Sequence, residues 1–195
     1  LEGVARALRG RFAALSLAPM PAEAAALTAR AFGDVGWWVT EEDTTANWVA
    51  RIEGQDFAAY WERRPSRLRN TVRRKLRAAK LAVEIRDRFD DAVWNEYESV
   101  YRESWKPAEG SPGFLRALAA QEGAAGTLRL GIARDGGRAV ACQFWTVENR
   151  IAIIHKLAHI EAERGASPGT VLSEAMFRHV IDHDRPAMID FGTGD

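Results

Sequence analysis

Three closely spaced strand patterns in the second half of the sequence constrain the fold of this chain more than any other feature. They cover residues 127–133, 139–147 and 151–160, and they are rich in apolar and β-branched side chains, as strands are. An Asp-Gly-Gly triplet at 135–137 is a strong tight-turn signal, and the segment 148–150 is short enough to join the next pair. Turns this short connect antiparallel strands, so the sequence predicts three consecutive antiparallel strands in one sheet.

Helical and strand patterns on both sides of these strands complete an alternating order. A Ser-Pro pair at 167–168 can begin a helix, because proline is tolerated in the first helical turn. The other expected elements are a strand at 81–86, helices at about 90–105 and 111–121, a helix from 167 to about 183, and a strand at 187–191. The order from residue 81 is therefore β-α-α-β-β-β-α-β. This order predicts an α/β fold with a mixed, mainly antiparallel sheet flanked by helices.

The first 80 residues show a different pattern. Helices are expected at 2–14 and 21–30, strands at 36–40 and 47–52, and a helical segment from residue 56 that Pro65 breaks or restarts. The polar link at 41–45 is short enough for a hairpin between the two strands. We therefore divide the chain into residues 1–80, a partial N-terminal α/β unit, and residues 81–195, a second domain.

Positive charge is concentrated in one short segment, although the chain as a whole has 27 basic and 27 acidic residues. Residues 63–80 contain nine cations and no acid: Arg63, Arg64, Arg67, Arg69, Arg73, Arg74, Lys75, Arg77 and Lys80. Leu68, Val72 and Leu76 recur every fourth residue, which predicts a basic helix with one apolar stripe. Like charges four residues apart are mildly destabilising. The segment therefore indicates an anionic ligand or partner at one face, and not general nucleic-acid binding.

Composition and spacing argue against several other classes of protein. The single Cys142 excludes an internal disulfide framework and any multi-cysteine metal site, and a reducing, cytoplasmic location is expected. No apolar run approaches the ~20 residues that span a bilayer, and no signal-peptide pattern is present. His179 and His183 are four residues apart on a predicted helix, a spacing that could bind a metal. The HExxH pattern is missing, so we expect no metal site.

The turn that precedes the helix at 167 has the features of a phosphate site. A helix that begins near Ser167 leaves its first backbone N–H groups without internal partners, and the helix dipole favours an anion there. Gly165 and Gly169 would let the backbone approach a ligand closely, while Ser167 and Thr170 could donate hydroxyl hydrogen bonds. The alternative is that Ser167 caps the helix and Pro168 occupies its first position, with no ligand bound.

Four segments carry a resemblance to a known enzyme superfamily. They are residues 68–75 (Leu-Arg-Asn-Thr-Val-Arg-Arg-Lys), 155–158 (His-Lys-Leu-Ala), 167–172 (Ser-Pro-Gly-Thr-Val-Leu) and 189–195 (Ile-Asp-Phe-Gly-Thr-Gly-Asp). With the order of elements, they resemble the GNAT acyltransferases. Within these the chain is most similar to FemAB-like, tandem-GNAT proteins known as cellulose-biosynthesis-associated acetyltransferases. The resemblance covers roughly residues 60–195. It implies transfer of an acyl group from acetyl-CoA or another acyl-CoA to an amine or hydroxyl acceptor.

The resemblance also implies where the donor is held. The GNAT cofactor motif, Arg/Gln-x-x-Gly-x-Gly/Ala, is matched at both ends by residues 164–169, with Ser167 in place of the inner glycine. The strand at 151–160 would pair with the pantetheine arm. The expected cofactor-binding residues are Lys156, Leu157, Ala158, Arg164, Gly165, Ser167, Gly169 and Thr170. GNAT enzymes often take a general-acid tyrosine from a helix that follows this point, so the domain at 81–195 is expected to lack its last elements.

Proton removal from an acceptor requires a base near the donor thioester. His155, Glu161 and Asp190 are the expected catalytic residues, with His159 and Asp195 as further candidates. His155 and Lys156 lie in mid-strand and are expected to point to opposite faces of the sheet.

Several alternatives for function and partner remain open. One is a FemAB-like transferase that uses aminoacyl-tRNA, and another is a non-catalytic module in exopolysaccharide production that has kept the fold. A third is a plain anion-binding adaptor that acts through residues 63–80. The basic segment could bind the 3′-phosphate of CoA, an anionic glycan or lipid headgroup, an acidic acyl carrier protein, or acidic surface of the same chain.

Overall fold

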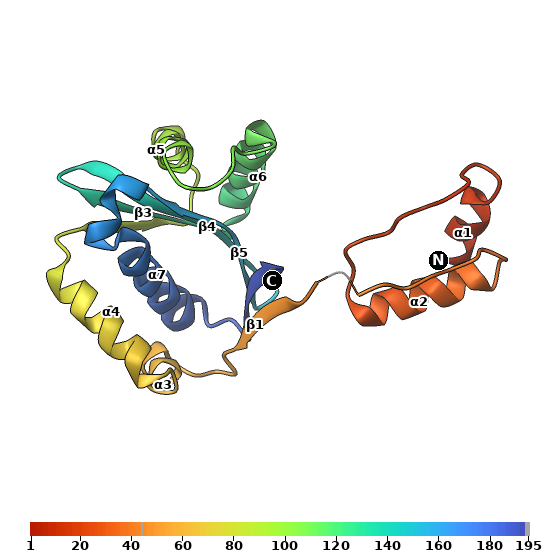
Figure 1. The fold of residues 1–195 in the computed structure, drawn as a ribbon, viewed down its shortest axis with the longest axis horizontal. Coiled ribbons are helices and arrows are strands. Elements are labelled where there is room, and N and C mark those ends of the chain that lie inside the picture. The colour runs from red at the N-terminus through yellow and green to blue at the C-terminus, as the bar shows by residue number, and fades with distance from the viewer. Residues whose placement is uncertain (44, 194–195) are drawn as a thin grey trace. The chain divides into compact units, whose positions relative to one another are not determined.

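The computed structural model describes residues 1–43 and 45–193, which divide into two compact units with their boundary between Ala46 and Asn47 (Figure 1). The first unit contains two helices, α1 (Glu2–Leu8) and α2 (Ala22–Gly33). They enclose a small apolar cluster of Ala5, Phe32 and Val35. The strand predicted at 36–40 is wrong, because Trp37 packs on this cluster and donates from Nε1 to the carbonyl of Ala5 at 3.0 Å.

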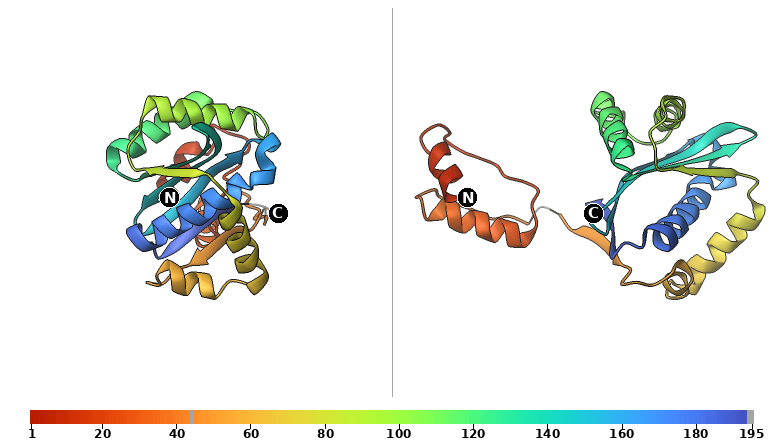
Figure 2. Two further views of the ribbon diagram at one scale, coloured as in Figure 1. Left: turned by 90° about the vertical axis from the view of Figure 1, so that its left-hand side faces the viewer. Right: turned by 180° about the vertical axis from the view of Figure 1, so that it is seen from behind.

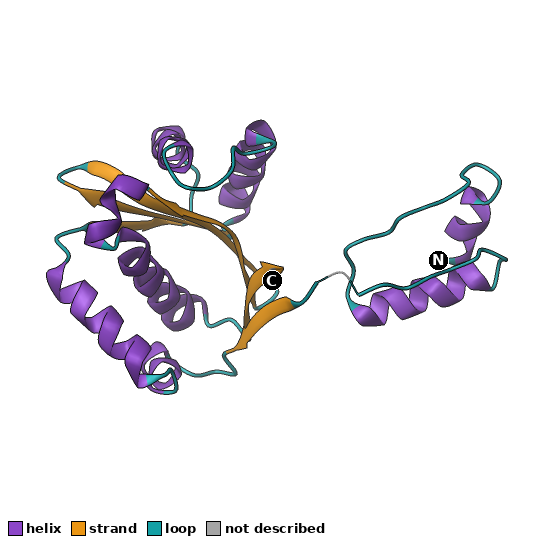
Figure 3. Ribbon diagram, viewed as in Figure 1, coloured by secondary structure: helices purple, strands orange, loops and turns teal. Residues whose placement is uncertain are grey.

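The second unit is built on a six-stranded sheet with the order β1-β6-β5-β4-β3-β2 (Figure 3). The strands are β1 (Asn47–Arg51), β2 (Ala82–Arg86), β3 (Leu128–Asp135), β4 (Arg138–Glu148), β5 (Ile151–His159) and β6 (Met188–Thr193). Every neighbouring pair is antiparallel except β5 and β6, which are parallel. The predicted run of three antiparallel strands is therefore confirmed as β3, β4 and β5.

Helices cover both faces of this sheet. They are α3 (Phe57–Glu62), α4 (Ser66–Ala78), α5 (Asp91–Arg102), α6 (Pro112–Ala125) and α7 (Pro168–His179). A short 3₁₀ segment (Glu161–Ala166) precedes α7, and a π-helical turn (Val180–Asp184) follows it. Figures 1 and 2 show α5 and α6 on one face and α3, α4 and α7 on the other. The structure thus confirms an α/β fold with a mostly antiparallel sheet flanked by helices, and the order β-α-α-β-β-β-α-β from residue 81.

Each face of the sheet has its own hydrophobic core. On the α5 and α6 face, Trp94 and Tyr97 pack with Leu130 and Phe144 of the sheet. On the α7 face, Leu172 and Met176 pack with Trp145, Ala152 and Ile189, and the α3 residues Phe57 and Tyr60 belong to the same core. Local sequence signals set the helix starts, as where Asp90 accepts hydrogen bonds from the amides of Ala92 and Val93 at the start of α5. The sequence left Asp90 or Asp91 as the cap of this helix, and the structure shows that it is Asp90.

The structure groups residues 47–80 with the second unit, whereas the sequence placed a division after residue 80. The first reason is pairing, because β1 adds to the edge of the sheet along β6, with Val49 opposite Asp190. The second reason is packing. Helix α4 lies against α7, and Val72 of the α4 apolar stripe is buried. Across the described residues, no helix is long and apolar enough to cross a membrane.

Candidate functional site

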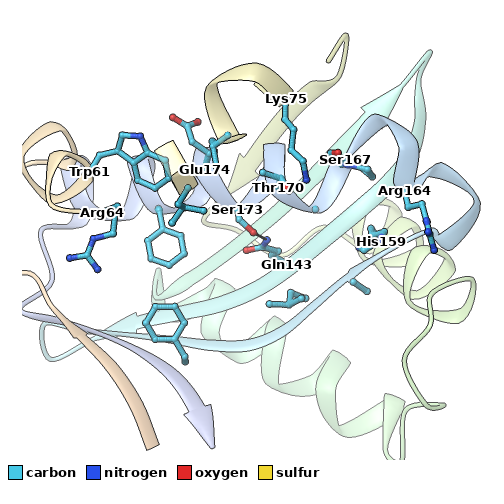
Figure 4. Close-up of a pocket in the computed structure, with 18 of the residues that line it drawn as sticks. Trp61, Arg64, Lys75, Gln143, His159, Arg164, Ser167, Thr170, Ser173 and Glu174 are labelled. Carbon is cyan, nitrogen blue, oxygen red and sulfur yellow. Dashed lines mark hydrogen bonds between the residues drawn. The ribbon is translucent and has the colours of Figure 1, made fainter. Parts of the chain in front are cut away.

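A cleft of about 610 Å³ opens on the α7 face of the sheet (Figure 4). α4 contributes Lys75 to its lining, and the adjacent start of α7 contributes the residues from Ser167 to Thr170. β5 contributes Leu157 and His159 to the floor. Figure 4 places Arg164 and His159 at one end of the cleft, and Trp61 and Arg64 at the other. Strand, turn and helix therefore meet at one concave surface.

The floor of the cleft is a place where the sheet opens. β5 and β6 pair only through Ile151–Met188, Ala152–Ile189 and Ile153–Asp190. β5 continues along β4 as far as His159, opposite Ala141, without further pairing to β6. The backbone groups of β5 after Ile153 that face β6 are therefore not used in that parallel ladder. An extended ligand can hydrogen-bond to such a free strand edge.

The start of α7 has the form predicted for an anion site. Ser167 has a left-handed backbone (φ 56°), and its hydroxyl makes no capping hydrogen bond. Its carbonyl accepts from the amides of Thr170 at 3.0 Å and Val171 at 3.2 Å, and Pro168 has no N–H. Among residues 1–43 and 45–193, the Gly169 amide has no hydrogen-bond acceptor. Ser167 is the N-cap residue and Pro168 lies in the first turn, as the alternative without a ligand also expected, but the Ser167 hydroxyl makes no capping bond and Ser167 lines the cleft beside that free amide.

A cation of α4 completes this end of the cleft. The Lys75 ammonium donates to Oγ1 of Thr170 at 3.2 Å, directly over the start of α7. Taken over the part of the chain that is described, none of the nine cations at 63–80 forms a salt bridge. Lys75 and Arg64 line the cleft, whereas Arg73, Arg74 and Arg77 line a separate surface hollow. The sequence identified the charge of this segment but not the two residues that turn inward.

The other predicted cofactor residues divide into those that reach the cleft and those that do not. Leu157, Ala158 and Arg164 line it, and Arg164 also donates to the Glu161 carboxylate at 3.0 Å. Gly165 does not line it, and a Cβ added at Gly165 would meet no atom within 4 Å. A Cβ at Gly169 would lie 3.1 Å from Nδ1 of His159, so the absence of a side chain matters at this glycine.

A β-bulge corrects the expected directions of His155 and Lys156. Phe144 pairs with Lys156 and Trp145 pairs with Ile154, which leaves His155 as the extra residue in β5. The His155 ring stacks on Phe144 at 4.9 Å, and the Lys156 ammonium lies 2.9 Å from the Glu109 carboxylate. Both side chains therefore lie on the α5 and α6 face. Lys156 does not reach the cleft, and its predicted contact with the donor is not supported.

Two of the three predicted catalytic residues lie near each other on this second face. Burial lowers the pKa of His155, while the charges of Glu122 and Asp190 oppose this shift. Nε2 of His155 is 2.8 Å from Oγ1 of Thr146. Asp190 accepts from Asn47 Nδ2 at 2.9 Å and from the Gly192 amide at 2.7 Å. Asp190 is the last residue of β6 that pairs with β5, so these groups flank the point where the sheet opens.

Glu161 is not brought to that point, because it begins the segment after the far end of β5. There it lies near His159, whose Nε2 is 3.9 Å from the Glu161 carboxylate. The His159 ring packs on Trp105 at 4.3 Å between ring centroids, and burial lowers its pKa against the opposing charge of Glu161. His159 thus lines the cleft at the end where α7 starts, and Glu161 lies beside it outside the lining. Asp195 lies outside the described residues.

A buried chain of hydrogen bonds that was not predicted from the sequence supports the middle of the cleft. Trp145 Nε1 donates to Oε1 of Gln143 at 2.9 Å, and Nε2 of Gln143 donates to Oγ of Ser173 at 2.7 Å. An indole can only donate, so this order fixes the Gln143 amide with its NH₂ toward Ser173. Ser173 therefore keeps its hydroxyl proton for a group in the cleft. Gln143 and Ser173 are separated by 30 residues, which hides the pair from sequence reasoning.

A possible metal cluster lies at the far end of α7. His179, His183 and Asp184 offer ligand atoms within 4.8 Å of one another. The Asp184 carboxylate, however, already receives Nε and Nη2 of Arg129 at 2.9 and 2.5 Å. The two histidine rings stack at 5.0 Å. We interpret the group as part of a buried ion pair, and the absence of a metal from the function stays a prediction.

Comparison with known proteins matches residues 66–195 to the family described as acetyltransferase (GNAT) domain, which is more than half of the chain. The comparison with curated protein sequences found no match. Solved structures with a similar fold were found at low sequence identity. They include L-PGS from Bacillus licheniformis (TM-score 0.57, 16% identity, 84% of this chain and 49% of that chain). They also include the C-terminal domain of a protein named as a lysylphosphatidylglycerol synthetase from Agrobacterium fabrum (0.54, 12%, 77% and 46%).

A third is a conserved protein of unknown function from Bacteroides thetaiotaomicron (TM-score 0.55, 18% identity, 79% of this chain and 52% of that chain). The chain spans about half the length of these three structures.

Proposed function

The chain belongs to the GNAT acetyltransferase family, and on this premise we propose that it transfers an acyl group from an acyl-CoA to an amine or hydroxyl acceptor. One observation carries the proposal. Three donors converge at the start of α7: the unpaired Gly169 amide, the Ser167 hydroxyl, which makes no capping bond, and the Lys75 ammonium. They lie beside β5, which separates from β6 after Ile153. Backbone donors, hydroxyls and a cation at a helix start are suited to a diphosphate.

The donor would lie along the cleft, with its diphosphate at the start of α7. Gly169 would donate its amide, Ser167 and Thr170 their hydroxyls, and Lys75 its charge. The free edge of β5 after Ile153 would pair with the amides of the pantetheine arm, and Ser173 has a hydroxyl proton to donate in mid-cleft. The side chains of Leu157 and Phe177 would exclude water from the arm.

The acceptor would approach from the opposite face of the sheet. Bound acyl-CoA supplies the thioester carbonyl as the electrophile. His155 is held by Thr146 and by its stacking on Phe144, and burial keeps its imidazole neutral and able to accept a proton. Asp190 would orient the acceptor or stabilise the protonated imidazole. A backbone N–H of β5 past the bulge would stabilise negative charge on the carbonyl oxygen.

Finer assignments are part of the proposal. We place the chain with the FemAB-like, cellulose-biosynthesis-associated acetyltransferases on the four sequence segments that resemble them. The acyl group would be acetyl, and the location cytoplasmic. The outward arginines of α4 would bind an acidic partner such as an acyl carrier protein.

Aminoacyl transfer from tRNA is a second candidate function. It is supported by the arginines of α4 that line a separate surface hollow and form no salt bridge within the described residues. Abolition of activity by RNase would select this function over transfer from acyl-CoA. A non-catalytic module that has kept the fold is the remaining alternative, and it predicts no response to CoA thioesters.

Isothermal titration with CoA and acetyl-CoA tests the proposal. Wild-type protein is expected to bind both, and Gly169→Glu is expected to bind neither, because its side chain and charge would obstruct and repel a phosphate. Gly113→Glu is the matched control: it makes the same change in α6, where nothing lies within 4 Å of an added Cβ, and it should bind as wild type does. Equal affinity of CoA for wild type and Gly169→Glu would contradict the proposal.

A further inference from the structure

The end of the cleft opposite the diphosphate site contains an unpaired arginine. Arg64 lies between α3 and α4, and its guanidinium carbon lies 4.5 Å from the centroid of the Tyr60 ring. Arg64 lines the main cleft and also a second cavity of about 470 Å³ against β1. Tyr60 and Phe191 line both cavities as well. Arg64 therefore stands where the two cavities meet, close to the residue that follows Asp190.

The guanidinium of Arg64 donates no hydrogen bond to any of the described residues. Its Nε atom is buried and has no hydrogen-bond partner among the described residues. Within that same part of the chain, no carboxylate forms a salt bridge with Arg64. Arg129 differs from Arg64 in this respect, because its Nε and Nη2 both donate to the carboxylate of Asp184. A cleft-lining guanidinium that has no carboxylate partner in the protein is suited to an anionic acceptor from a ligand.

The cleft near Arg64 is largely apolar, with Trp61, Leu68 and Phe177 in its lining. Glu174 of α7 lines it as well, and its carboxylate accepts hydrogen bonds from the guanidinium of Arg178. Along α7 the separation from Thr170 to Phe177 is seven residues, or about 10 Å at the rise of an α-helix. The cleft thus has Lys75 and Arg164 at the end proposed for a diphosphate, and the guanidinium of Arg64 at its other end. One cation among aromatic side chains suits one negative charge better than a second phosphate.

We propose that Arg64 binds a carboxylate carried by a substrate of this site, at the end of the cleft remote from the diphosphate. The two Nη groups of a guanidinium present N–H donors that match the two oxygens of a carboxylate, and stacking on Tyr60 holds the guanidinium plane in place. The carboxylate could belong to the donor, as the free end of a dicarboxylic acyl group, or to the acceptor, as in an amino acid. This inference rests on the proposed function, because it takes the diphosphate end as the site of CoA.

Titration calorimetry with paired ligands tests both possible sources of the carboxylate, the donor and the acceptor. In the donor arm, acetyl-CoA and succinyl-CoA are titrated into wild type, Arg64→Gln and Arg67→Gln. In the acceptor arm, glycine and methylamine are titrated into the same proteins saturated with CoA. Arg67 is exposed on α4 and lines neither cavity, so Arg67→Gln controls for loss of one charge from this segment.

The expected result is a preference of about tenfold or more for the carboxylate ligand of one pair, as one charge-assisted hydrogen-bonded pair provides. Arg64→Gln should abolish this preference, and Arg67→Gln should retain it. CoA affinity should stay the same in Arg64→Gln, which also shows that the variant is folded. Intact CoA binding without a carboxylate preference in either pair, or with a preference that survives Arg64→Gln, would overturn the inference alone. Failure of wild type to bind CoA would overturn the proposed function and this inference together.

Discussion

Two substitutions of Ser167 test two properties of this residue separately: the strain of its backbone, and the contribution of its hydroxyl to ligand binding. Ser167 occupies the position where the GNAT motif has its inner glycine, and its backbone is left-handed, with φ at 56°. A non-glycine residue in this conformation costs about 1–2 kcal/mol. Glycine would relieve that strain, although its greater freedom in the unfolded chain costs about 0.5–1 kcal/mol. Ser167→Gly is therefore expected to stabilise the protein without ligand by about 0.5–1 kcal/mol.

The effect on binding should have the opposite sign. The Ser167 hydroxyl makes no capping bond, so its loss removes nothing from the helix itself. A hydrogen bond to a charged phosphate oxygen contributes about 1.5–3 kcal/mol, which corresponds to a loss of about 10- to 150-fold in CoA affinity. Ser167→Ala removes the hydroxyl but keeps the strained backbone, so it should lose similar affinity without the gain in stability.

Thermal unfolding and calorimetric titration of the three proteins give both quantities. Stabilisation of this size should raise the melting temperature of Ser167→Gly by about 1–4 °C, given about 2–4 °C per kcal/mol for a chain of this length. Ser167→Ala should melt close to wild type. If Ser167→Gly melted below wild type, the hydroxyl would support the helix start after all. If both variants bound CoA as tightly as wild type, the serine would not contact the ligand.

Three further predictions concern other parts of the domain. Asp184→Ala should destabilise the fold by about 3–5 kcal/mol in denaturant unfolding, because it leaves the buried Arg129 unpaired. Burial raises the pKa of Asp184, but hydrogen bonds from Arg129 and His183 outweigh this and lower it. Its stabilisation should therefore be present at neutral pH and be lost in acid, as pH falls through the lowered pKa. In a pH profile of kcat/KM, activity that depends on neutral His155 should fall only below about pH 6.5, because burial lowers the pKa of that imidazole. Gly123→Ala should lower the melting temperature, since its Cβ would lie 2.5 Å from the Phe89 amide nitrogen, whereas Gly113→Ala in the same helix should raise it slightly.

The second unit could be predicted from the sequence because its signals are local. The Asp-Gly-Gly turn, the Asp90 cap and the proline at the start of α7 each fix one boundary from neighbouring residues. The division of the chain could not be predicted in this way. Residues 47–51 read correctly as a strand, but their partner is β6, more than 130 residues later, and not the segment at 36–40. Tryptophan has a strong strand propensity, yet the indole N–H of Trp37 donates a hydrogen bond to the carbonyl of Ala5.

One part of the candidate site, the backbone turn before α7, could be predicted from the sequence. The turn before α7 was identified from its glycines and its Ser-Pro pair, and it lines the cleft. The directions of His155 and Lys156 were not predictable, because a bulge of one residue turns both to the same face. Lys75 and Arg64 are two of nine equivalent cations in the sequence. Only the packing of α4 on α7 distinguishes them from the rest.

A crystal structure of the protein with CoA tests the central claim most directly. The account predicts that the diphosphate lies within hydrogen-bond distance of the Gly169 amide and the Ser167 hydroxyl, with Lys75 beside it. It also predicts that the pantetheine arm runs along the edge of β5 beyond Ile153. Density for CoA elsewhere on the protein would contradict it, as would a cleft in which β5 and β6 have closed together along their length.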